Sequence, residues 1–247
     1  MSVDLQPFID SPMLLAGILL VVFCGAVVQA GLGMGFGLTA APLLAVLDPH
    51  LVPVPALVIG FASSTWGAWN EKQGIAWNEV FIGVWGRAAG VVIAAIILAN
   101  LADKGSFVLI FGAMILLAVM LSSVNVTIPF NRTTLLAMST VSGLMGTITS
   151  VGAPPLALIY HGRTAAKARP TLAAFFAIGC ALSLVGLYVS GWFHISDFHL
   201  ALIMAPGMMV GLATGKALRH HFDRRYRAAL LSIAAFAAII LIARELA

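Results

Sequence analysis

Arg87 is the residue that tells most about chemistry, because it lies in the middle of an apolar stretch of the chain. It follows Glu79 by eight residues, and the rest of the run 79–101 carries no charge. An arginine at the centre of a bilayer costs about 2.5 to 3.5 kcal/mol on insertion scales, so it needs a partner there. Its N–H groups can hold a small oxyanion through two parallel hydrogen bonds. Two alternatives are that the side chain reaches the membrane surface or that it bonds carbonyl groups at helix ends.

The acidic residues favour an anion as the ligand of Arg87. All nine lie in tails, in loops or at the ends of apolar segments: Asp4, Asp10, Asp48, Glu71, Glu79, Asp103, Asp197, Asp223 and Glu245. A cation transporter, or a proton relay built from carboxylates, needs acidic residues inside the membrane. We therefore predict an anionic substrate, with no metal and no cofactor.

Two glycine-rich stretches predict breaks in otherwise helical segments. The first contains Gln29, Gly31, Gly33, Gly35, Gly37 and Pro42, and the second contains Gly143, Gly146, Thr147, Thr149, Ser150, Gly152, Pro154 and Pro155. Each interior glycine costs a helix about 1 kcal/mol. The apolar segment 13–47 is also far longer than the roughly 20 residues that cross a bilayer. We expect broken or re-entrant helices here, with Pro42, Pro154 and Pro155 as the structural helix breaks.

Broken helices would give Arg87 suitable neighbours. The N-terminus of a half-helix presents unpaired N–H groups and the positive end of the helix dipole, which attract anions. The predicted substrate-binding residues are Arg87, Gln29, Gly31, Gly33, Gly35, Gly37, Thr147, Thr149, Ser150 and Gly152. The alternative for glycine in such helices is close packing between them. We expect that alternative for the pairs Gly86/Gly90 and Gly207/Gly211, and we leave cavity lining by Ser63, Ser64 and Thr65 open.

The composition requires that these residues sit in a membrane protein. The 247 residues are 61% hydrophobic and 9% charged, whereas soluble domains average about 45–50% apolar and about 25% charged. The cations are too few and too scattered for nucleic-acid binding. We predict an all-α polytopic membrane protein whose eight apolar segments are 13–47, 51–70, 79–101, 105–123, 133–160, 170–191, 198–218 and 227–245.

The two halves of the chain look alike. The glycine-rich stretches occupy corresponding places, and so do the glycine pairs of the third and seventh segments. We predict a single membrane transporter domain, 1–247, with one four-helix repeat at about 13–123 and a second at about 133–247. An even number of crossings in each repeat would make the repeats parallel rather than inverted.

The distribution of cations predicts the orientation. With eight crossings, one side holds Lys104, Arg163, Lys167, Arg169, Lys216, Arg219, Arg224, Arg225 and Arg227, and the other holds Lys72, Arg132 and Arg244. Cytoplasmic loops are rich in Lys and Arg. We expect the loops of segments 5–6 and 7–8 in the cytoplasm and both termini outside, in the plasma (inner) membrane.

The glycine and proline patterns resemble those of a known family. The stretch from Gly31 to Pro42, its echo from Gly143 to Pro155, and Pro206-Gly207 with Gly211 are similar to the sulfite exporter TauE/SafE family, in the same order along nearly the whole chain. The resemblance implies two repeats of membrane helices that move sulfur-containing anions such as sulfite and sulfonates. Thr147, Thr149 and Ser150 stand where that family commonly has glycines, so the exact anion stays open.

These observations predict a membrane transporter of a small sulfur-containing anion that works by alternating access. An anion channel, or a transporter of another small organic acid, is the alternative. We predict no enzyme, because Ser150 has no histidine clearly at its depth to act as a base. The expected partners are the anion and the lipid bilayer, without nucleic acid. The direction, the coupling ion and a homo-oligomer are left open.

Overall fold

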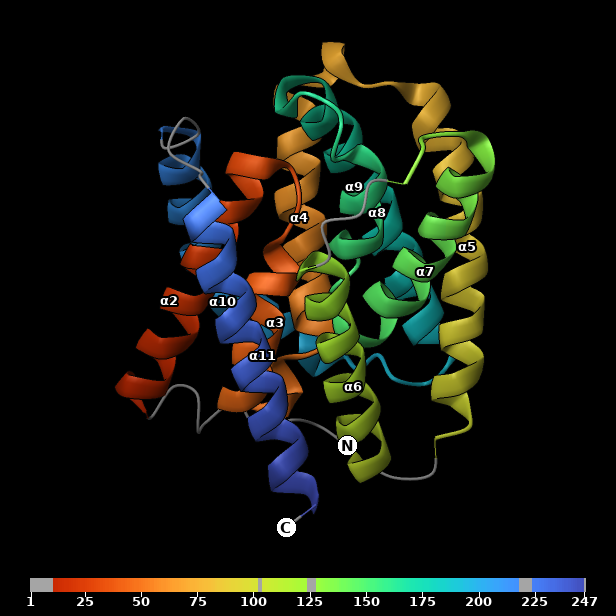
Figure 1. Cartoon of the computed structure of the whole chain (residues 1–247). Coiled ribbons are helices and arrows are strands. Elements are labelled where there is room, and N and C mark those ends of the chain that lie inside the picture. The colour runs from red at the N-terminus through yellow and green to blue at the C-terminus, as the bar shows by residue number, and fades with distance from the viewer. Residues whose placement is uncertain (1–10, 102–103, 124–127, 218–223, 247) are drawn as a thin grey trace.

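The computed structural model describes residues 11–101, 104–123, 128–217 and 224–246, and these ranges are helical without any strand (Figure 1). Within them the α-helices are α2 (Pro12–Leu32), α3 (Phe36–Leu47), α4 (Val54–Asn70), α5 (Trp77–Ala99), α6 (Lys104–Ser123), α7 (Arg132–Thr149), α8 (Ala153–Tyr160), α9 (Ala165–Val189), α10 (Ile195–Ala217) and α11 (Arg224–Leu246). Two short 3₁₀ helices, η1 (Pro49–Leu51) and η2 (Lys72–Gly74), flank α4.

Helices α2 and α3 form a hairpin, which we call the first hairpin. Gly33 ends α2 in the left-handed conformation at φ 74°, and its N–H donates to the Gln29 carbonyl at 2.8 Å. Gly35, at φ 106°, precedes α3. These angles favour glycine, because a Cβ strains the backbone there. Leu47 at the end of α3 lies against Gly17 near the start of α2. The two helices are therefore antiparallel, and their outer ends meet at one end of the molecule.

Helices α7 and α8 form the second hairpin. The Asn131 side chain caps α7 by accepting from the Thr134 N–H at 2.8 Å. Ser150 ends α7 at φ 64°, the one positive φ outside glycine among the described residues. The rings of Phe130 and Tyr160, which flank the two outer ends of the hairpin, lie 5.2 Å apart. This hairpin therefore also returns to the end of the molecule where it starts.

Both glycine-rich stretches do interrupt their helices, but the prolines do not make the breaks. Pro42 lies inside α3, so the expectation that it breaks the helix is wrong. Gly33, in the left-handed conformation, already ends α2. Pro42 has no N–H to donate, and this is tolerated inside α3 where neighbouring groups satisfy the carbonyl left without a partner. Pro154 and Pro155 stand in the first turn of α8, where N–H groups lack helical partners and proline fits well. They start a helix just after the break.

The tips of the two hairpins meet in the middle of the molecule, where a methyl group on Gly37 would overlap the carbonyl oxygen of Ser150. Segments 13–47 and 133–160 therefore turn back here, which fits re-entrant helices better than the count of one crossing for each segment. Because the hairpins turn back, Lys72 and Arg132 lie at the same end as Arg169, and Lys104 starts α6 at the opposite end (Figure 1).

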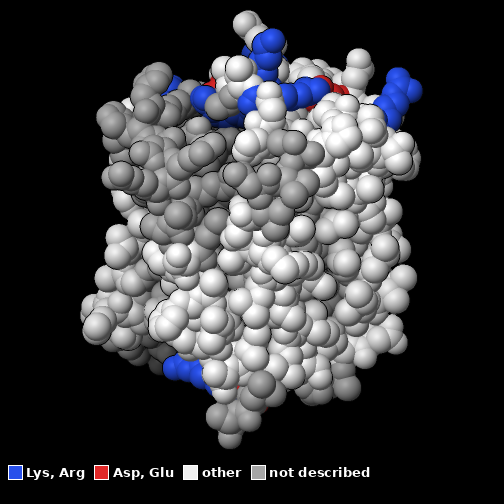
Figure 2. Space-filling view, viewed as in Figure 1, with Lys and Arg blue, Asp and Glu red and all other residues white. Residues whose placement is uncertain are grey.

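We call the first of these ends the basic end. The end of α4, the starts of α7 and α9 and the end of α10 lie there (Figure 1), so its cations with described side chains include Lys72, Arg132, Arg163, Lys167, Arg169 and Lys216. Figure 2 shows Lys and Arg gathered there at the top of the view, with few charges elsewhere among the described residues of that face. The opposite end contains the start of α2 and the end of α11, where Arg244 donates to the Val46 carbonyl at 3.4 Å.

Each hairpin packs mainly against a helix from the other half of the chain. Helix α5 lies along α7, and α10 lies along α2. Gly86 and Gly90 bring α5 against the backbone of α7, and Gly207 and Gly211 bring α10 against the backbone of α2. A Cβ at any of the four would meet backbone atoms of the neighbouring helix. The predicted packing role of these glycines is confirmed.

Six helical stretches in the described ranges are long and apolar enough to span a membrane: Pro12–Leu32, Pro49–Asn70, Trp77–Ala99, Gly105–Ser123, Ala166–Val189 and Ile195–Ala217. Their outer surface is apolar as well. On α5 the exposed side chains Phe81, Trp85, Val92 and Ile96 follow helical spacing along one face, and that stripe suits lipid better than water.

Candidate functional site

Arg87 is buried at the centre of the molecule and binds neutral oxygens. Its relative exposure is 1%. Nη1 donates to the carbonyl and hydroxyl oxygens of Ser142 on α7, at 3.0 and 2.9 Å, and Nη2 donates to Ser183 Oγ on α9 at 3.2 Å. The alternative that the side chain reaches the surface is thus wrong. Bonding to a carbonyl does occur, although Ser142 lies inside α7 and not at its end.

Glycines from two other elements make room for the guanidinium. A Cβ at Gly146 or Gly152 of the second hairpin would lie 2.7 or 2.5 Å from the nearest terminal nitrogen. A Cβ at Gly179 of α9 would lie 2.8 Å from Nε. The rings of Phe175 and Phe176 on α9 are 5.8 and 5.9 Å from the guanidinium carbon. Any larger residue at these glycines would displace the charge.

The charge of Arg87 is not neutralised by its surroundings. Its hydrogen bonds go to neutral groups, no carboxylate among the described residues is paired with it, and its buried Nε has no hydrogen-bond partner. Removing an unpaired ion from water costs several kcal/mol. An oxyanion that approached this guanidinium would recover part of that cost and satisfy Nε. The arrangement is therefore suited to attract an anion.

Gln29 connects the first hairpin to α4. Its Oε1 accepts from the Phe36 N–H at 3.2 Å, and its Nε2 donates to Ser64 Oγ at 2.9 Å and to the Gly33 carbonyl at 3.3 Å. Gly35 has no side chain to cap α3, so Gln29 supplies the acceptor from across the hairpin. The next residues of the first turn, Gly37 and Leu38, present backbone N–H groups beyond this cap.

A cavity of about 30 Å³ lies between the two hairpin tips, and we call it the central cavity. It is lined by Gln29, Gly35, Phe36, Gly37, Leu38, Ala56, Leu57, Gly60, Ser64, Ser150, Gly152, Ala153, Phe176 and Cys180. This is room for one or two water molecules, since one water needs about 10–15 Å³ of such space. The cavity of the described conformation is therefore too small for an organic anion of several heavy atoms.

The predicted site residues fall into three groups around this cavity. Gln29, Gly35, Gly37, Ser150 and Gly152 line it. Arg87 lies behind Gly152 and Phe176, and Thr147 lies near it through a 2.9 Å hydrogen bond to Ser183 Oγ. Gly31, Gly33 and Thr149 do not line the central cavity. Thr149 donates to the Met145 carbonyl at 2.7 Å and accepts from the Val151 N–H at 3.1 Å, which stabilises the break.

Sequence reasoning missed several residues of this site. Ser142 and Ser183 hold the guanidinium, and Gly179 makes room for it. Their spacing in the sequence gave a weak indication of the site. Ser142 and Gly146 are four residues apart, as are Gly179 and Ser183, so each pair shares one face of its helix. Ser64, left open above, lines the cavity and accepts a hydrogen bond from Gln29.

The helices and the buried site together define a polytopic α-helical membrane protein with a cationic centre. The sequence model of the family described as Sulfite exporter TauE/SafE matches residues 18–241 of the 247. The chain belongs to this family of membrane exporters of sulfite and related sulfur anions. No curated protein and no solved structure gives a significant match.

Proposed function

We propose that this protein exports a small sulfur-containing oxyanion, sulfite or an organosulfonate, across the plasma membrane. The observation that carries the proposal is the buried guanidinium of Arg87, which has no carboxylate partner among the described residues and an unsatisfied Nε. A sulfonate or sulfite group offers several oxygens that two N–H groups of one guanidinium can bind together. The family of the chain points to the same class of anion.

The anion binds between the hairpin tips in this proposal. The central cavity has Gln29 and the start of α3 on one wall and the tip of the second hairpin on the other. Ser142 bonds both Arg87 Nη1, at 2.9 Å, and the Gly152 carbonyl, at 2.6 Å. A shift of the second tip would break these bonds, enlarge the cavity and bring Arg87 to its wall. The narrow cavity of the described conformation is then one state of an alternating-access cycle.

The two halves move as inverted repeats in the same proposal. Each half has a hairpin followed by three long helices: α2–α3 with α4, α5 and α6, and α7–α8 with α9, α10 and α11. The hairpins start from opposite ends, and the α5–α7 and α10–α2 contacts exchange under the same relation. This supports a single domain with inverted repeats, in place of the parallel ones expected from eight crossings. The basic end faces the cytoplasm, and both chain termini lie outside.

The test is flux of radiolabelled sulfite in liposomes that contain the purified protein. Saturable flux with counterflow is expected, and it should be inhibited by whichever of sulfate, thiosulfate, taurine or sulfoacetate is also carried. Arg87→Gln should lower the flux about tenfold to a hundredfold, because hydrogen bonds to a charged group are worth about 1.5–3 kcal/mol. Arg87→Lys keeps the charge but loses the planar guanidinium, so its flux should lie between that of the wild type and that of Arg87→Gln.

The state of each variant is checked by size-exclusion chromatography and thermal melting before flux is compared. Unchanged saturable flux in well-folded Arg87→Gln protein would remove Arg87 from the mechanism. Flux that neither saturates nor shows counterflow would make the protein an anion channel instead.

A further inference from the structure

A second arginine, Arg169, lies between the basic end and the central cavity. Arg169, in the first turns of α9, pairs with Glu71 at the end of α4, with 3.1 Å between Nη1 and Oε1. The two side chains are 17% and 22% exposed, so the pair is mostly buried but keeps some contact with solvent. The Nε of Arg169 is buried and has no hydrogen-bond partner. This guanidinium therefore retains one buried donor without a partner besides the one that is paired with Glu71.

Arg169 also reaches the interior. With Glu71 it lines a small cavity of about 10 Å³, whose other walls are Gln29, Ala30, Gly33, Ser63, Trp66, Gly67 and Ala173. Gln29 lines this cavity and the central one. Gly33, at the end of α2, packs so closely on Arg169 that a Cβ there would lie 2.5 Å from the Arg169 Cγ. One arginine thus connects the surface, the tip of the first hairpin and the side chain that separates the two cavities.

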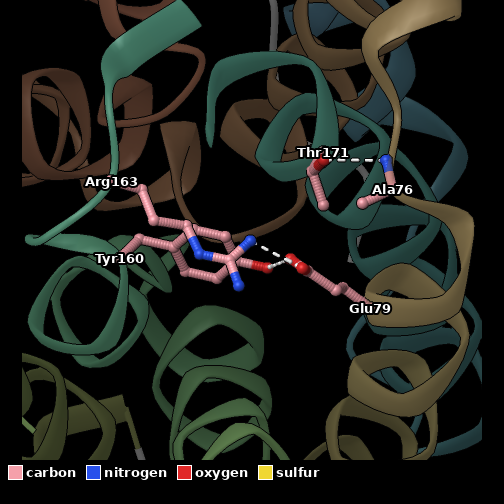
Figure 3. Close-up of polar contacts among 5 residues, drawn as sticks. All are labelled: Ala76, Glu79, Tyr160, Arg163 and Thr171. Atoms are coloured by element: carbon pink, nitrogen blue, oxygen red, sulfur yellow. Dashed lines mark hydrogen bonds and ion pairs between the residues drawn. The ribbon is translucent and has the colours of Figure 1, made fainter. Parts of the chain in front are cut away.

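A second ion pair at the same end lacks these connections. Arg163 Nη1 lies 2.6 Å from Glu79 Oε1, and Tyr160 donates to Glu79 Oε2 at 2.7 Å, as Figure 3 shows. The guanidinium of Arg163 also lies 3.9 Å from the centre of the Phe130 ring. None of these residues lines either cavity. This pair clamps the outer ends of α5 and the second hairpin, so it is the natural control for Arg169 and Glu71.

We propose that Arg169 is the first residue to bind the anion on its route from the basic end to the central cavity. This proposal rests on the transport function proposed above. The arriving anion takes the place of the Glu71 carboxylate on Nη1. The pair keeps some contact with solvent, so an oxyanion can reach the guanidinium and compete with Glu71 for it. The anion then passes Gln29 to reach the central cavity. When no anion is bound, the ion pair of Glu71 with Arg169 closes the route at the basic end.

The experiment measures sulfite uptake into right-side-out and inside-out membrane vesicles. Thiol labelling of the Lys72→Cys variant identifies the face that carries the basic end. Arg169→Gln should raise the half-saturating sulfite concentration about tenfold at the face with the basic end and change it little at the other face. Glu71→Gln should lower that concentration several-fold at the same face, because the competing carboxylate is gone.

The matched controls are Arg163→Gln and Glu79→Gln, which remove one charge each from the clamp and should leave half-saturation unchanged at both faces. If Arg169→Gln does not fold, Glu71→Gln carries the test alone. Half-saturation that is unchanged in Arg169→Gln or Glu71→Gln, or that changes equally at both faces, overturns the proposal. A wild-type protein without saturable sulfite flux contradicts the transport function itself, so the two failures are distinguishable.

Discussion

At the scale of single residues, Arg87 is connected to the tip of the second hairpin through Ser142. Both bonds from Nη1 go to Ser142, and the Ser142 hydroxyl donates to the Gly152 carbonyl at 2.6 Å. The charge and the tip are therefore coupled through one side chain. In the proposed mechanism, an anion that draws the guanidinium toward the cavity would weaken the bond that holds Gly152, and Ser142 would couple substrate binding to tip movement.

Gln29 is the residue whose loss should be most costly to the first hairpin. Gln29→Leu keeps the approximate size but leaves the Phe36 N–H and the Ser64 hydroxyl without their partner, which costs about 1–3 kcal/mol for a buried polar group. We expect a clearly lower melting temperature by tryptophan fluorescence in detergent. Thr214→Val is the control, since that exposed hydroxyl only donates to the Val210 carbonyl of its own helix and its loss should change stability by less than about 0.5 kcal/mol. Equal melting of both variants would contradict the capping role.

The residues that sequence reasoning found are those whose chemistry is unusual in a membrane. A charge between apolar segments marks Arg87, and an amide beside alternating glycines marks Gln29. Ser142, Ser183 and Gly179 were missed because serine and glycine are common in membrane helices, where they serve packing as well. Only the fold shows which of them face the guanidinium.

At the scale of elements, the two hairpins work as a pair because their tips touch. Gly37→Ala would place a methyl group on the Ser150 carbonyl, and overpacking of this kind costs about 1–3 kcal/mol. We expect a lower melting temperature and reduced flux. Gly17→Ala, in the same hairpin, is the control, because its Cβ would only meet Leu47 side-chain atoms at 3.8 Å. It should be neutral or stabilise by up to about 1 kcal/mol through helix propensity. Equal destabilisation by both changes would show that the tip contact is unimportant.

The existence of both breaks could be predicted from the sequence, but their geometry could not. Alternating glycines show that a helix ends, whereas the direction of the next helix depends on contacts made far along the chain. The returning path of α3 depends on Leu47 meeting Gly17 and Phe36 meeting Gly25. Pro42 misled the placement of the first break, because the left-handed residues Gly33 and Gly35 already end α2 nine and seven residues earlier.

At the scale of the whole molecule, the two hairpins place the loops on different sides from those expected with eight crossings. Eight crossings would place Lys72 and Arg244 on the same side, whereas the fold places them at opposite ends (Figure 1). In a variant without its two native cysteines, Arg244→Cys should react in intact cells with a thiol reagent that cannot cross membranes. Lys72→Cys should react only after lysis. Labelling of both positions in intact cells would restore the count of eight crossings.

The exchanged packing of the two halves also affects when their contacts can form during synthesis. Helix α2 is made early in synthesis, yet the helix that lies along it, α10, is among the last to be made. The face of α2 that meets Gly207 and Gly211 therefore has no partner helix until α10 has been made. A chain that stops short of α10 would leave the first hairpin without its main packing partner.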